Sequence, residues 1–457
     1  MTKKKIIILI SIIVVLVVLI GIGIFALSGD KSSKIAEKLD LGEKYLDELE
    51  YEKALAYFME VLEIDPMNVD AYVGIVDTYI AMGDYEKALE YAQKGYEETG
   101  DARLETKVKE IELMMVNLKP IPEVAPESNT SPISDDYVID WKDPNLETAI
   151  REATEIYDRD IVYGDVKDIK LLNLSGYGIS DISALEVLTG LEKLGLNENE
   201  ITDISVLQKL TNLKELGLSD NNISDISALS NLINLQYLTL AYNEIKDISA
   251  LSNLTQLIYL SLYWNQISDI SALGKLKNLQ DLNVAVNQIN DISGLREIPI
   301  LMELNISSNK ISDISELSDL IYLMQLDLSH NEINDISSLG GLSYLEELSL
   351  STNQIKDISA LGSLTNLKKL YLNSNLISDI SAIGTLTDLR ELDLGGNMIK
   401  DIGILASIIN LETLNLGGNE ISDISVLGNL TNLREVRLAG LPISDYSAVS
   451  FVRAVYY

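Results

Sequence analysis

From Leu171 onward, apolar and polar positions follow one pattern, LxxLxLxxNxIxDIxxLxxLxx, which repeats every 22 residues. The asparagine of this pattern recurs eleven times, at positions 199, 221, 243, 265, 287, 309, 331, 353, 375, 397 and 419. Variant units at Tyr177 and Leu441 flank the array and bring it to about thirteen coils. One coil of this length cannot bury its apolar face alone, so the pattern predicts a solenoid of stacked coils.

Two periodicities within each coil predict two kinds of local structure. In ELGLSDN, Leu216 and Leu218 alternate with polar or small residues, which is the period of a short strand. The SALxxLTNL stretches that follow space their leucines by three or four residues, which predicts a short helix on the outer face. Equivalent strands pair in parallel from coil to coil, so we expect one sheet to extend from Leu171 to Leu438.

The repeated polar residues stand where the chain turns. We expect each asparagine to hydrogen-bond backbone groups that would otherwise be unpaired, at a cost of about 1–3 kcal/mol each. Eleven of thirteen copies read Asp-Ile-Ser, with variants at Asp401 and Asp445, and these side chains are expected to bond nearby backbone amides. A calcium site needs several converging oxygens, and a serine nucleophile needs a partnered base. Each turn has one aspartate, and the single histidine, His330, has no motif around it, so we interpret these residues as structural.

An earlier segment, residues 34–118, is predicted to be helical, and its residues 35–102 contain two similar units at an offset of 34 residues. YEKAL occurs at 51–55 and again at 85–89, among apolar and small residues at helical spacing. This period resembles the tetratricopeptide repeat, although Gly100 stands where the second unit would have its closing proline. The resemblance implies an all-α region of helical hairpins. Its function is either to bind a peptide in a groove or to act as a rigid spacer.

The end of this segment and the residues after it predict a capping helix and a linker. The stretch 103–118 has helical spacing, with Val108, Ile111 and Met115 expected to face inward against the hairpins. Residues 119–136 contain four prolines and no periodicity, which predicts a semi-extended linker.

Both ends of the repeat array, residues 171–440, are expected to be capped. Within residues 137–170, Asp143 is placed to N-cap a helix that has Pro144 at its first position. Residues 441–457 are expected to form the C-terminal cap. Its predicted apolar lid consists of Tyr446, Phe451, Val452 and Val455.

The N-terminus combines basic and apolar stretches. Residues 6–27 are apolar apart from one serine and two glycines, and at 1.5 Å per residue this run spans about 33 Å, enough for a bilayer core. We predict a single transmembrane helix that contacts the lipid bilayer, with the lysine-rich residues 1–5 in the cytoplasm and the bulk of the chain extracytoplasmic. The FALSG stretch leaves a cleaved signal peptide as the alternative, although its apolar region is usually only about 7–15 residues.

The short repeat with its DISAL phrase, and the DPNLETAIREA stretch before it, resemble the internalin-like leucine-rich repeat proteins of Gram-positive bacteria. The resemblance implies an α/β solenoid, shaped as a horseshoe with a concave parallel β-sheet. It also implies protein ligands, with adhesion to a host as one role. Leucine-rich repeats serve many functions, so the ligand has to be argued from the positions that vary.

Composition narrows the function further. The formal net charge of −35, from 35 Lys and Arg against 70 Asp and Glu, argues against nucleic acid as a partner. The absence of cysteine excludes disulfides, thiolate metal sites and cysteine nucleophiles. No cofactor is implied. No segment outside the repeats is long enough for a catalytic cleft, so we expect no enzyme and keep a cell-wall hydrolase as a distant alternative.

The outward strand positions do not repeat, so a ligand would be recognised there. Tyr237, Tyr259 and Tyr263 fall on neighbouring coils, with Tyr242 and Trp264 at the edge beside them. Exposed Tyr and Trp are typical of interface hot spots, although stacking along the sheet for stability is the alternative. This aromatic group is the first candidate feature.

Acidic residues are the second feature of the same columns. They are Glu215, Asp281, Glu303, Asp327, Glu347, Glu391, Asp393 and Glu435, against Lys193, Lys369 and Arg437. Such a face speeds encounter with a basic partner. The predicted ligand-binding residues are Tyr237, Tyr242, Tyr259, Tyr263, Trp264, Asp281, Glu303, Asp327 and Tyr371. We predict recognition of an extracytoplasmic protein ligand, with an envelope scaffold acting through the tetratricopeptide-like groove as the alternative.

Overall fold

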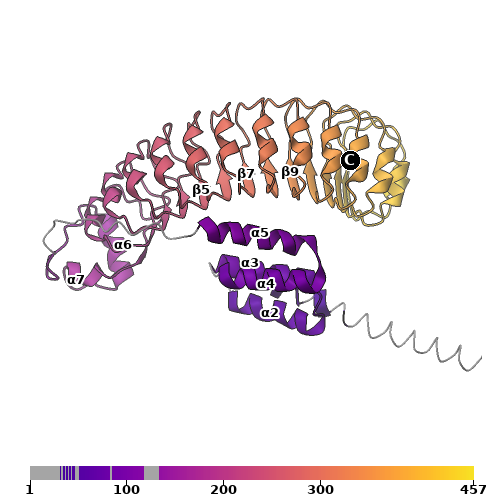
Figure 1. Ribbon diagram of the computed structural model, residues 1–457. Helices are drawn as coiled ribbons and strands as arrows, with labels where there is room; N and C mark the ends of the chain where they lie inside the picture. The colour runs from indigo at the N-terminus through magenta and orange to yellow at the C-terminus, as the bar shows by residue number, and fades with distance from the viewer. Residues whose placement is uncertain are drawn as a thin grey trace, which may run out of the picture. The chain divides into compact units, whose positions relative to one another are not determined.

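The computed structural model describes residues 31, 34–36, 38–39, 41–42, 44–46, 51–82, 85–117 and 133–457. The chain divides into two compact units, Met1–Glu127 and Ser128–Tyr457, which are described separately (Figure 1). The predicted transmembrane helix at 6–27 and the basic tail at 1–5 lie outside the described residues. None of the helices in the described ranges is both long enough and apolar enough to cross a membrane.

The first unit contains helical hairpins, as the 34-residue period predicts. Its helices are α2 (Tyr51–Ile64), α3 (Val69–Ala81), α4 (Tyr85–Thr99) and α5 (Ala102–Asn117), and each packs on the next. Helix α3 begins at the N-cap Asn68, whose side chain accepts the N–H of Ala71 at 2.9 Å.

One aromatic ring lies at the centre of this helical core. Phe58 is buried against Ile75 and Ala88, and a Cβ at Gly74 would stand 2.5 Å from its ring. The glycine is therefore needed for close helix packing. Helix α5 contributes the fully buried Ile111, and Val108 packs against the same core, as the sequence predicts. The side chain of Met115 lies outside the described part of the chain.

The second unit begins with helix α6 (Pro144–Thr154) and the short helix α7 (Tyr163–Val166). Asp143 caps α6 as predicted, because its Oδ1 accepts the N–H groups of Asn145 at 2.8 Å and Leu146 at 3.2 Å. Its Oδ2 accepts the N–H groups of Ser180 and Asp181, so one carboxylate joins the cap helix to the first coil.

The array forms a single 14-stranded sheet in which the strands follow one another in chain order and every neighbouring pair is parallel. The strands are β1 (Leu171–Asn173), β2 (Lys193–Gly195), β3 (Glu215–Gly217), β4 (Tyr237–Thr239), β5 (Tyr259–Ser261), β6 (Asp281–Asn283), β7 (Glu303–Asn305), β8 (Gln325–Asp327), β9 (Glu347–Ser349), β10 (Lys369–Tyr371), β11 (Glu391–Asp393), β12 (Thr413–Asn415), β13 (Glu435–Arg437) and β14 (Ala454–Tyr456). They lie side by side along the curved array of coils (Figure 1).

Short helices follow the strands, and they are of the 3₁₀ type. They are η1 (Ser183–Val187), η2 (Ser205–Lys209), η3 (Ser227–Asn231), η4 (Ser249–Asn253), η5 (Ser271–Lys275), η6 (Ser293–Glu297), η7 (Ser315–Asp319), η8 (Ser337–Gly341), η9 (Ser359–Ser363), η10 (Ser381–Thr385), η11 (Gly403–Ser407), η12 (Ser425–Asn429) and η13 (Ser447–Val449). A segment of this length completes a 3₁₀ turn more readily than an α-helix, which needs a longer run to form its hydrogen bonds.

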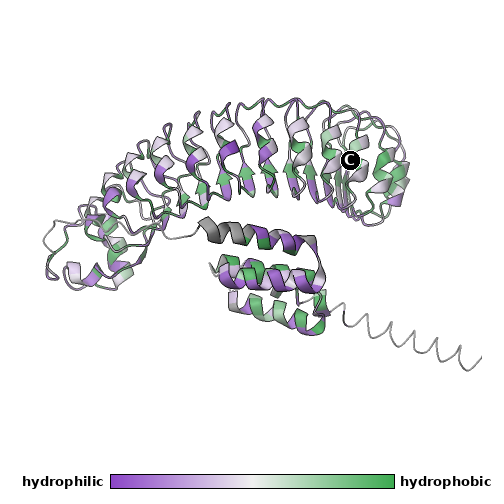
Figure 2. Ribbon diagram, in the orientation of Figure 1, coloured by the Kyte–Doolittle hydropathy of each residue, from purple (hydrophilic) through white to green (hydrophobic). Residues whose placement is uncertain are grey.

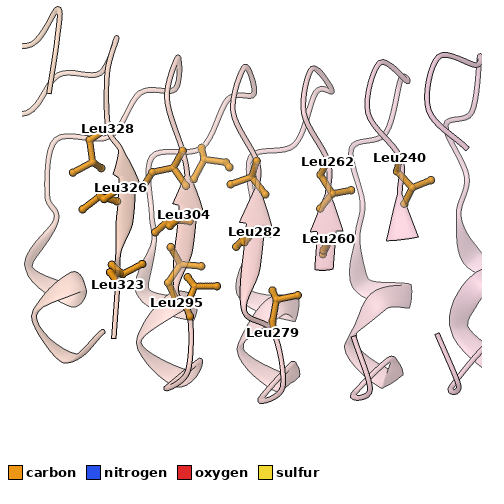
Figure 3. Packing of buried hydrophobic residues seen from close by; sticks show 14 of the residues in the cluster. Leu240, Leu260, Leu262, Leu279, Leu282, Leu295, Leu304, Leu323, Leu326 and Leu328 are labelled. Carbon is orange, nitrogen blue, oxygen red and sulfur yellow. The ribbon is translucent and has the colours of Figure 1, made fainter. Parts of the chain in front are cut away.

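Leucine and isoleucine rows form one continuous core through the array. Figure 3 shows leucines of successive coils at equivalent places, among them Leu260, Leu282 and Leu304 on neighbouring strands. Each fully buried leucine contributes about 1.5–3 kcal/mol through the hydrophobic effect. In Figure 2, hydrophilic and hydrophobic residues alternate along the coils, as the repeated pattern of the sequence predicts.

The repeated asparagine links each coil to the one before it. Asn221 accepts the N–H of Ile201 at 3.0 Å and donates to the carbonyl oxygens of Leu196 at 2.9 Å and Leu218 at 3.1 Å. All eleven asparagines accept the N–H group of the residue twenty positions earlier. The predicted role in pairing backbone groups of the turn is confirmed.

The repeated aspartate starts each short helix. All thirteen accept the backbone N–H of the residue two positions later, with N···O distances of 2.8–2.9 Å. The variants Asp401 and Asp445 make the same bond, because the acceptor is the aspartate and the donor is backbone.

The C-terminal cap differs from the prediction in two ways. Val449 and Val452 are buried, but Phe451 between them has 46% of its surface exposed, so its assignment to the apolar lid is wrong. The two valines occupy the core-facing positions of this short turn, which leaves the intervening ring in solvent. The residues that follow form β14, which continues the sheet one strand beyond Leu438, where it was expected to end.

Candidate functional site

The candidate site lies on the outward positions of the sheet. Parallel pairing places Tyr237 beside Tyr259, Tyr259 beside Asp281 and Asp281 beside Glu303. Neighbouring strands lie about 4.8 Å apart, so these side chains form a continuous row. The leucine between the two outward positions of each strand points into the core, which fixes the row on the other face.

Aromatic residues of the candidate site fall into two sets. Tyr237 and Tyr259 stack across strands β4 and β5 with ring centroids 6.4 Å apart. We call Tyr242, Tyr263 and Trp264 the aromatic edge triad, since they follow those strands at the edge of the sheet. Tyr242 stacks on Trp264 at 5.6 Å and meets the edge of Tyr263 at 5.1 Å. Tyr242 and Trp264 remain 46% and 52% exposed.

Two residues of the edge triad stand at a turn position whose backbone conformation is unfavourable for bulky side chains. Tyr242, Trp264 and Val286 have φ angles of 53°, 55° and 55°, in the left-handed region. Large or β-branched residues adopt this conformation at a cost of about 1–3 kcal/mol. Gly396 and Gly418 occupy the same column further along the array and adopt φ angles of 64° and 68°. The backbone therefore does not require aromatic residues here.

Acidic residues surround a hollow beside the stacked tyrosines. We call it the acidic hollow and define it by Tyr259, Asp281, Glu303, Asp327, Glu347 and Tyr371. Its volume is about 490 Å³, and Asn283, Asn305, Gln325 and Ser349 complete its polar lining. Tyr259 on β5 and Tyr371 on β10 stand at its two ends, because the strands between them contribute the carboxylates.

The carboxylates of the hollow are unevenly compensated. Glu347 forms an ion pair with Lys369 at 3.1 Å, and the hydroxyl of Tyr371 donates to Glu391 at 2.8 Å. Within the described residues, Asp281, Glu303 and Asp327 have no ion-pair partner. This part of the sheet therefore carries uncompensated negative charge.

Asp281 and Glu303 both have raised pKa values, first because burial disfavours their charged forms and second because neighbouring carboxylates repel them. Burial, followed by repulsion from Glu303, raises the pKa of Asp281 to about 6. Desolvation against the sheet, followed by repulsion from Glu347, raises the pKa of Glu303. A cation placed between these groups would lower both pKa values and stabilise the charged forms.

The structure places the predicted residues in two neighbouring regions. Tyr259, Asp281, Glu303, Asp327 and Tyr371 line the acidic hollow, and Tyr237 stacks on Tyr259 at one end of it. Tyr242, Tyr263 and Trp264 form the separate edge triad. The polar neighbours Asn283, Asn305 and Gln325 were not among the predicted residues. They occupy the same outward strand positions as the predicted residues, and this could have identified them from the sequence.

Catalytic and metal chemistry have no support in the described residues. Across the described ranges, no group of three or more His, Asp or Glu side chains is placed to hold a metal ion. His330 is exposed at the edge turn. Nothing in this part of the chain points to catalysis, which agrees with a fold that typically serves as a binding scaffold.

Family comparisons identify both units. A model of leucine-rich repeats in two copies matches residues 211–253, 255–297, 323–363, 365–407 and 409–450. A tetratricopeptide repeat model matches residues 45–107. The second unit is thus a leucine-rich repeat domain and the first is a tetratricopeptide-like region. Among curated proteins, no sequence matches the chain.

Solved structures narrow the class to a family. The crystal structure of an internalin, inlF, from Listeria monocytogenes is 34% identical, with a TM-score of 0.67, over 73% of this chain and 99% of that one. The chain belongs to the internalin family of leucine-rich repeat proteins.

Two more distant structures share the fold alone. The functional domain of InlJ from Listeria monocytogenes is 22% identical with a TM-score of 0.52, over 71% of this chain and 80% of that one. The ectodomain of a plant membrane receptor kinase from Arabidopsis thaliana, solved in complex with CASPARIAN STRIP INTEGRITY FACTOR 2, is 23% identical with a TM-score of 0.52. That likeness covers 64% of this chain and 41% of the receptor chain.

Proposed function

We propose that this chain is a membrane-anchored surface protein that binds an extracytoplasmic protein ligand through the outward face of its leucine-rich repeat sheet. The acidic hollow is the observation that carries the proposal. Three carboxylates without ion-pair partners in the described residues line the hollow between two tyrosines, and titratable groups with shifted pKa values that gather in a hollow are candidates for a binding site. The anchor is proposed from the apolar run at residues 6–27.

The chemistry of the hollow selects a basic segment of the ligand. Asp281, Glu303 and Asp327 accept charge-assisted hydrogen bonds from Lys or Arg, which are stronger than neutral ones. The faces of Tyr259 and Tyr371 add cation–π attraction at the two ends. A formal charge of −35 also attracts a basic partner over long range.

The aromatic edge triad provides the apolar part of the same interface. Tyr259 in the hollow and Tyr263 in the triad belong to one coil, so a single ligand segment can contact both regions. The stacked rings of Tyr242 and Trp264 present rigid apolar surface, which loses little conformational entropy on binding. Hot spots of this kind commonly account for most of the binding energy.

Ligand capture tests the proposal. The full chain in detergent is used to capture a basic protein ligand identified by cross-linking at the cell surface, and the capture is repeated with the Asp281→Asn/Asp327→Asn variant. We expect at least about a tenfold loss of affinity, because two charge-assisted contacts disappear. Glu215→Gln is the matched control, since Glu215 lies in the same column but is already paired with Lys193. Equal losses in both variants would contradict a site in the hollow.

The tetratricopeptide-like unit supports a second function, assembly of the cell's own envelope proteins. It matches a repeat model over residues 45–107 and forms a compact unit by itself. Removal of residues 34–118 separates the two functions. Under the main proposal the shortened chain still captures the ligand, whereas an envelope scaffold would lose its partners.

A further inference from the structure

A second hollow lies outside the outward sheet face, at the C-terminal coils, and its charge is opposite to that of the chain. Its volume is about 640 Å³. We call it the basic groove and define it by Lys368, Arg390, Glu412, Arg434, Phe451 and Arg453. Four basic side chains and two carboxylates, Glu412 and Asp388, line it, although the whole chain has 35 basic against 70 acidic residues.

The repeat geometry explains why these charges meet. Lys368, Arg390, Glu412, Arg434 and Arg453 each directly precede one of the five strands β10 to β14. Residues in one column of successive coils lie about 4.8 Å apart, so side chains far apart in sequence become neighbours. In the N-terminal coils the same column reads Lys170, Glu192, Lys214, Gln236 and Ile258, so the basic cluster is local to the C-terminal end.

The basic groups are only partly neutralised within the groove. Arg434 pairs with Glu412 at 2.8 Å, while Arg390 lies 3.8 Å from the same carboxylate and has to share it. Lys368 pairs at 2.8 Å with Glu346, which precedes β9. Within the part of the chain that the structure describes, Arg453 has no ion-pair partner. Guanidinium groups on Arg390 and Arg453 are therefore available to an anion.

An exposed aromatic ring adds a second kind of contact. Phe451 lines the groove with 46% of its surface exposed, and it precedes Arg453 by two residues. A ring in this position offers apolar contact beside the guanidinium groups. A phosphate polymer has no apolar group to place there, whereas a peptide can present carboxylates and an apolar side chain together.

We propose that the basic groove is a second binding site, which takes an acidic peptide segment of a partner protein. Carboxylates of the segment bind the guanidinium groups of Arg390, Arg434 and Arg453, and an apolar side chain packs on Phe451. Arginine forms paired hydrogen bonds with carboxylates, which makes it suited to this recognition. The groove and the acidic hollow select opposite charges, so the two sites bind different segments.

Fluorescence anisotropy with the full chain in detergent tests the site. The probe is a labelled peptide of alternating glutamate and leucine, and the test variant is Arg390→Gln/Arg453→Gln. We expect the double variant to bind at least about tenfold more weakly, because both partly free guanidinium groups are lost. Lys214→Gln is the matched control, since Lys214 pairs with Glu192 as Lys368 pairs with Glu346, but lies in another coil. Unchanged binding by the double variant would overturn the proposal.

Two further variants distinguish a peptide from other anions. Glu412→Gln removes the competing carboxylate, so we expect tighter peptide binding. Phe451→Ser is expected to weaken binding of the glutamate–leucine peptide and to leave binding of inorganic polyphosphate unchanged. Equal effects of Phe451→Ser on both probes, or stronger binding of polyphosphate than of the peptide, would reject a peptide site. Circular dichroism of every variant checks that the repeat fold is retained.

Discussion

The turns after strands β5 and β12 have the same backbone and different side chains. Trp264 and Gly418 occupy one column, with φ angles of 55° and 68°, and each precedes a buried asparagine, Asn265 or Asn419. The asparagine is present in both turns because it pairs backbone groups that every coil shares. The residue before it is free to vary, and glycine suits its conformation best. Comparison of the two turns therefore separates what builds the solenoid from what is available for binding.

The largest predicted loss of stability comes from replacing the asparagine that both turns share. Asn265→Ala removes an acceptor for the N–H of Ile245 and a donor to the carbonyl oxygen of Leu240, both buried. We expect the free energy of unfolding to fall by about 3 kcal/mol, because buried backbone groups lose their partners. Urea denaturation measures this loss. The neighbouring exposed Gln266→Ala is the control, and an equal loss there would contradict the assignment of the asparagine column.

A smaller effect concerns the junction between cap and array. Burial raises the pKa of Asp143, but hydrogen bonds from backbone N–H groups, first among them that of Asp181, outweigh it and lower this pKa to about 2. A depressed folded pKa gives stability that is complete above the unfolded value of about 3.9 and is lost as the pH falls towards 2. We expect the second unit to lose about 2 kcal/mol over this range.

Melting temperatures of the chain and of Asp143→Asn across these pH values check the assignment. The variant has no carboxylate to titrate at the junction. Its stability is therefore expected to vary less with pH than that of the unmodified chain. Parallel curves for the two proteins would show that Asp143 is not the titrating group.

The variable part of the turn is predicted to have little effect on stability. Trp264→Gly removes a stacked ring but relieves a left-handed conformation, so we expect the free energy of unfolding to change by at most about 1 kcal/mol. The reciprocal change, Gly418→Ala, is expected to destabilise by about 1–2 kcal/mol, because a Cβ is introduced at positive φ. A large loss in Trp264→Gly would instead support stacking as the purpose of the ring.

The smallest effect concerns the acidic hollow itself. With the pKa of Asp281 raised to about 6, its charged form opposes folding, so stability attributable to this group falls as the pH rises from about 4 through 6. Asp281→Asn is therefore expected to raise the free energy of unfolding at neutral pH by up to about 1 kcal/mol. Chemical denaturation at about pH 7 and about pH 5 checks this, since the gain should shrink at the lower pH. A loss of stability at neutral pH would contradict the account of an uncompensated carboxylate.

Much of the fold could be predicted from the sequence because every coil has to fill the same core and pair the same backbone groups, so the same residues recur at the same positions. The asparagine and aspartate columns, the alternation in the strands and the cap residues Asp143 and Pro144 all act locally, so their positions predict their bonds. The last strand, β14, was missed because FVRAVYY does not carry the leucine pattern of earlier coils.

The candidate site was predictable only in part. The column numbering identified outward residues such as Tyr259 and Asp281, since a strand has a period of two. Side-chain geometry then decided which of them share a region. Lys369 pairs with Glu347 and leaves Asp281 uncompensated, and the rings of Tyr242 and Trp264 stack apart from that of Tyr237. The repeat pattern identifies which residues point outward, but it does not give the distances between their side chains.

The most direct test of the central claim pairs ligand capture with stability in one variant, Asp281→Asn/Trp264→Gly. We attribute binding to the variable columns and the stability of the fold to the repeated ones. The variant is therefore expected to have a free energy of unfolding within about 1 kcal/mol of that of the unmodified chain and to lose at least about a hundredfold in ligand affinity. A variant that still captures the ligand with full affinity, or that loses capture only because it unfolds, would contradict the account.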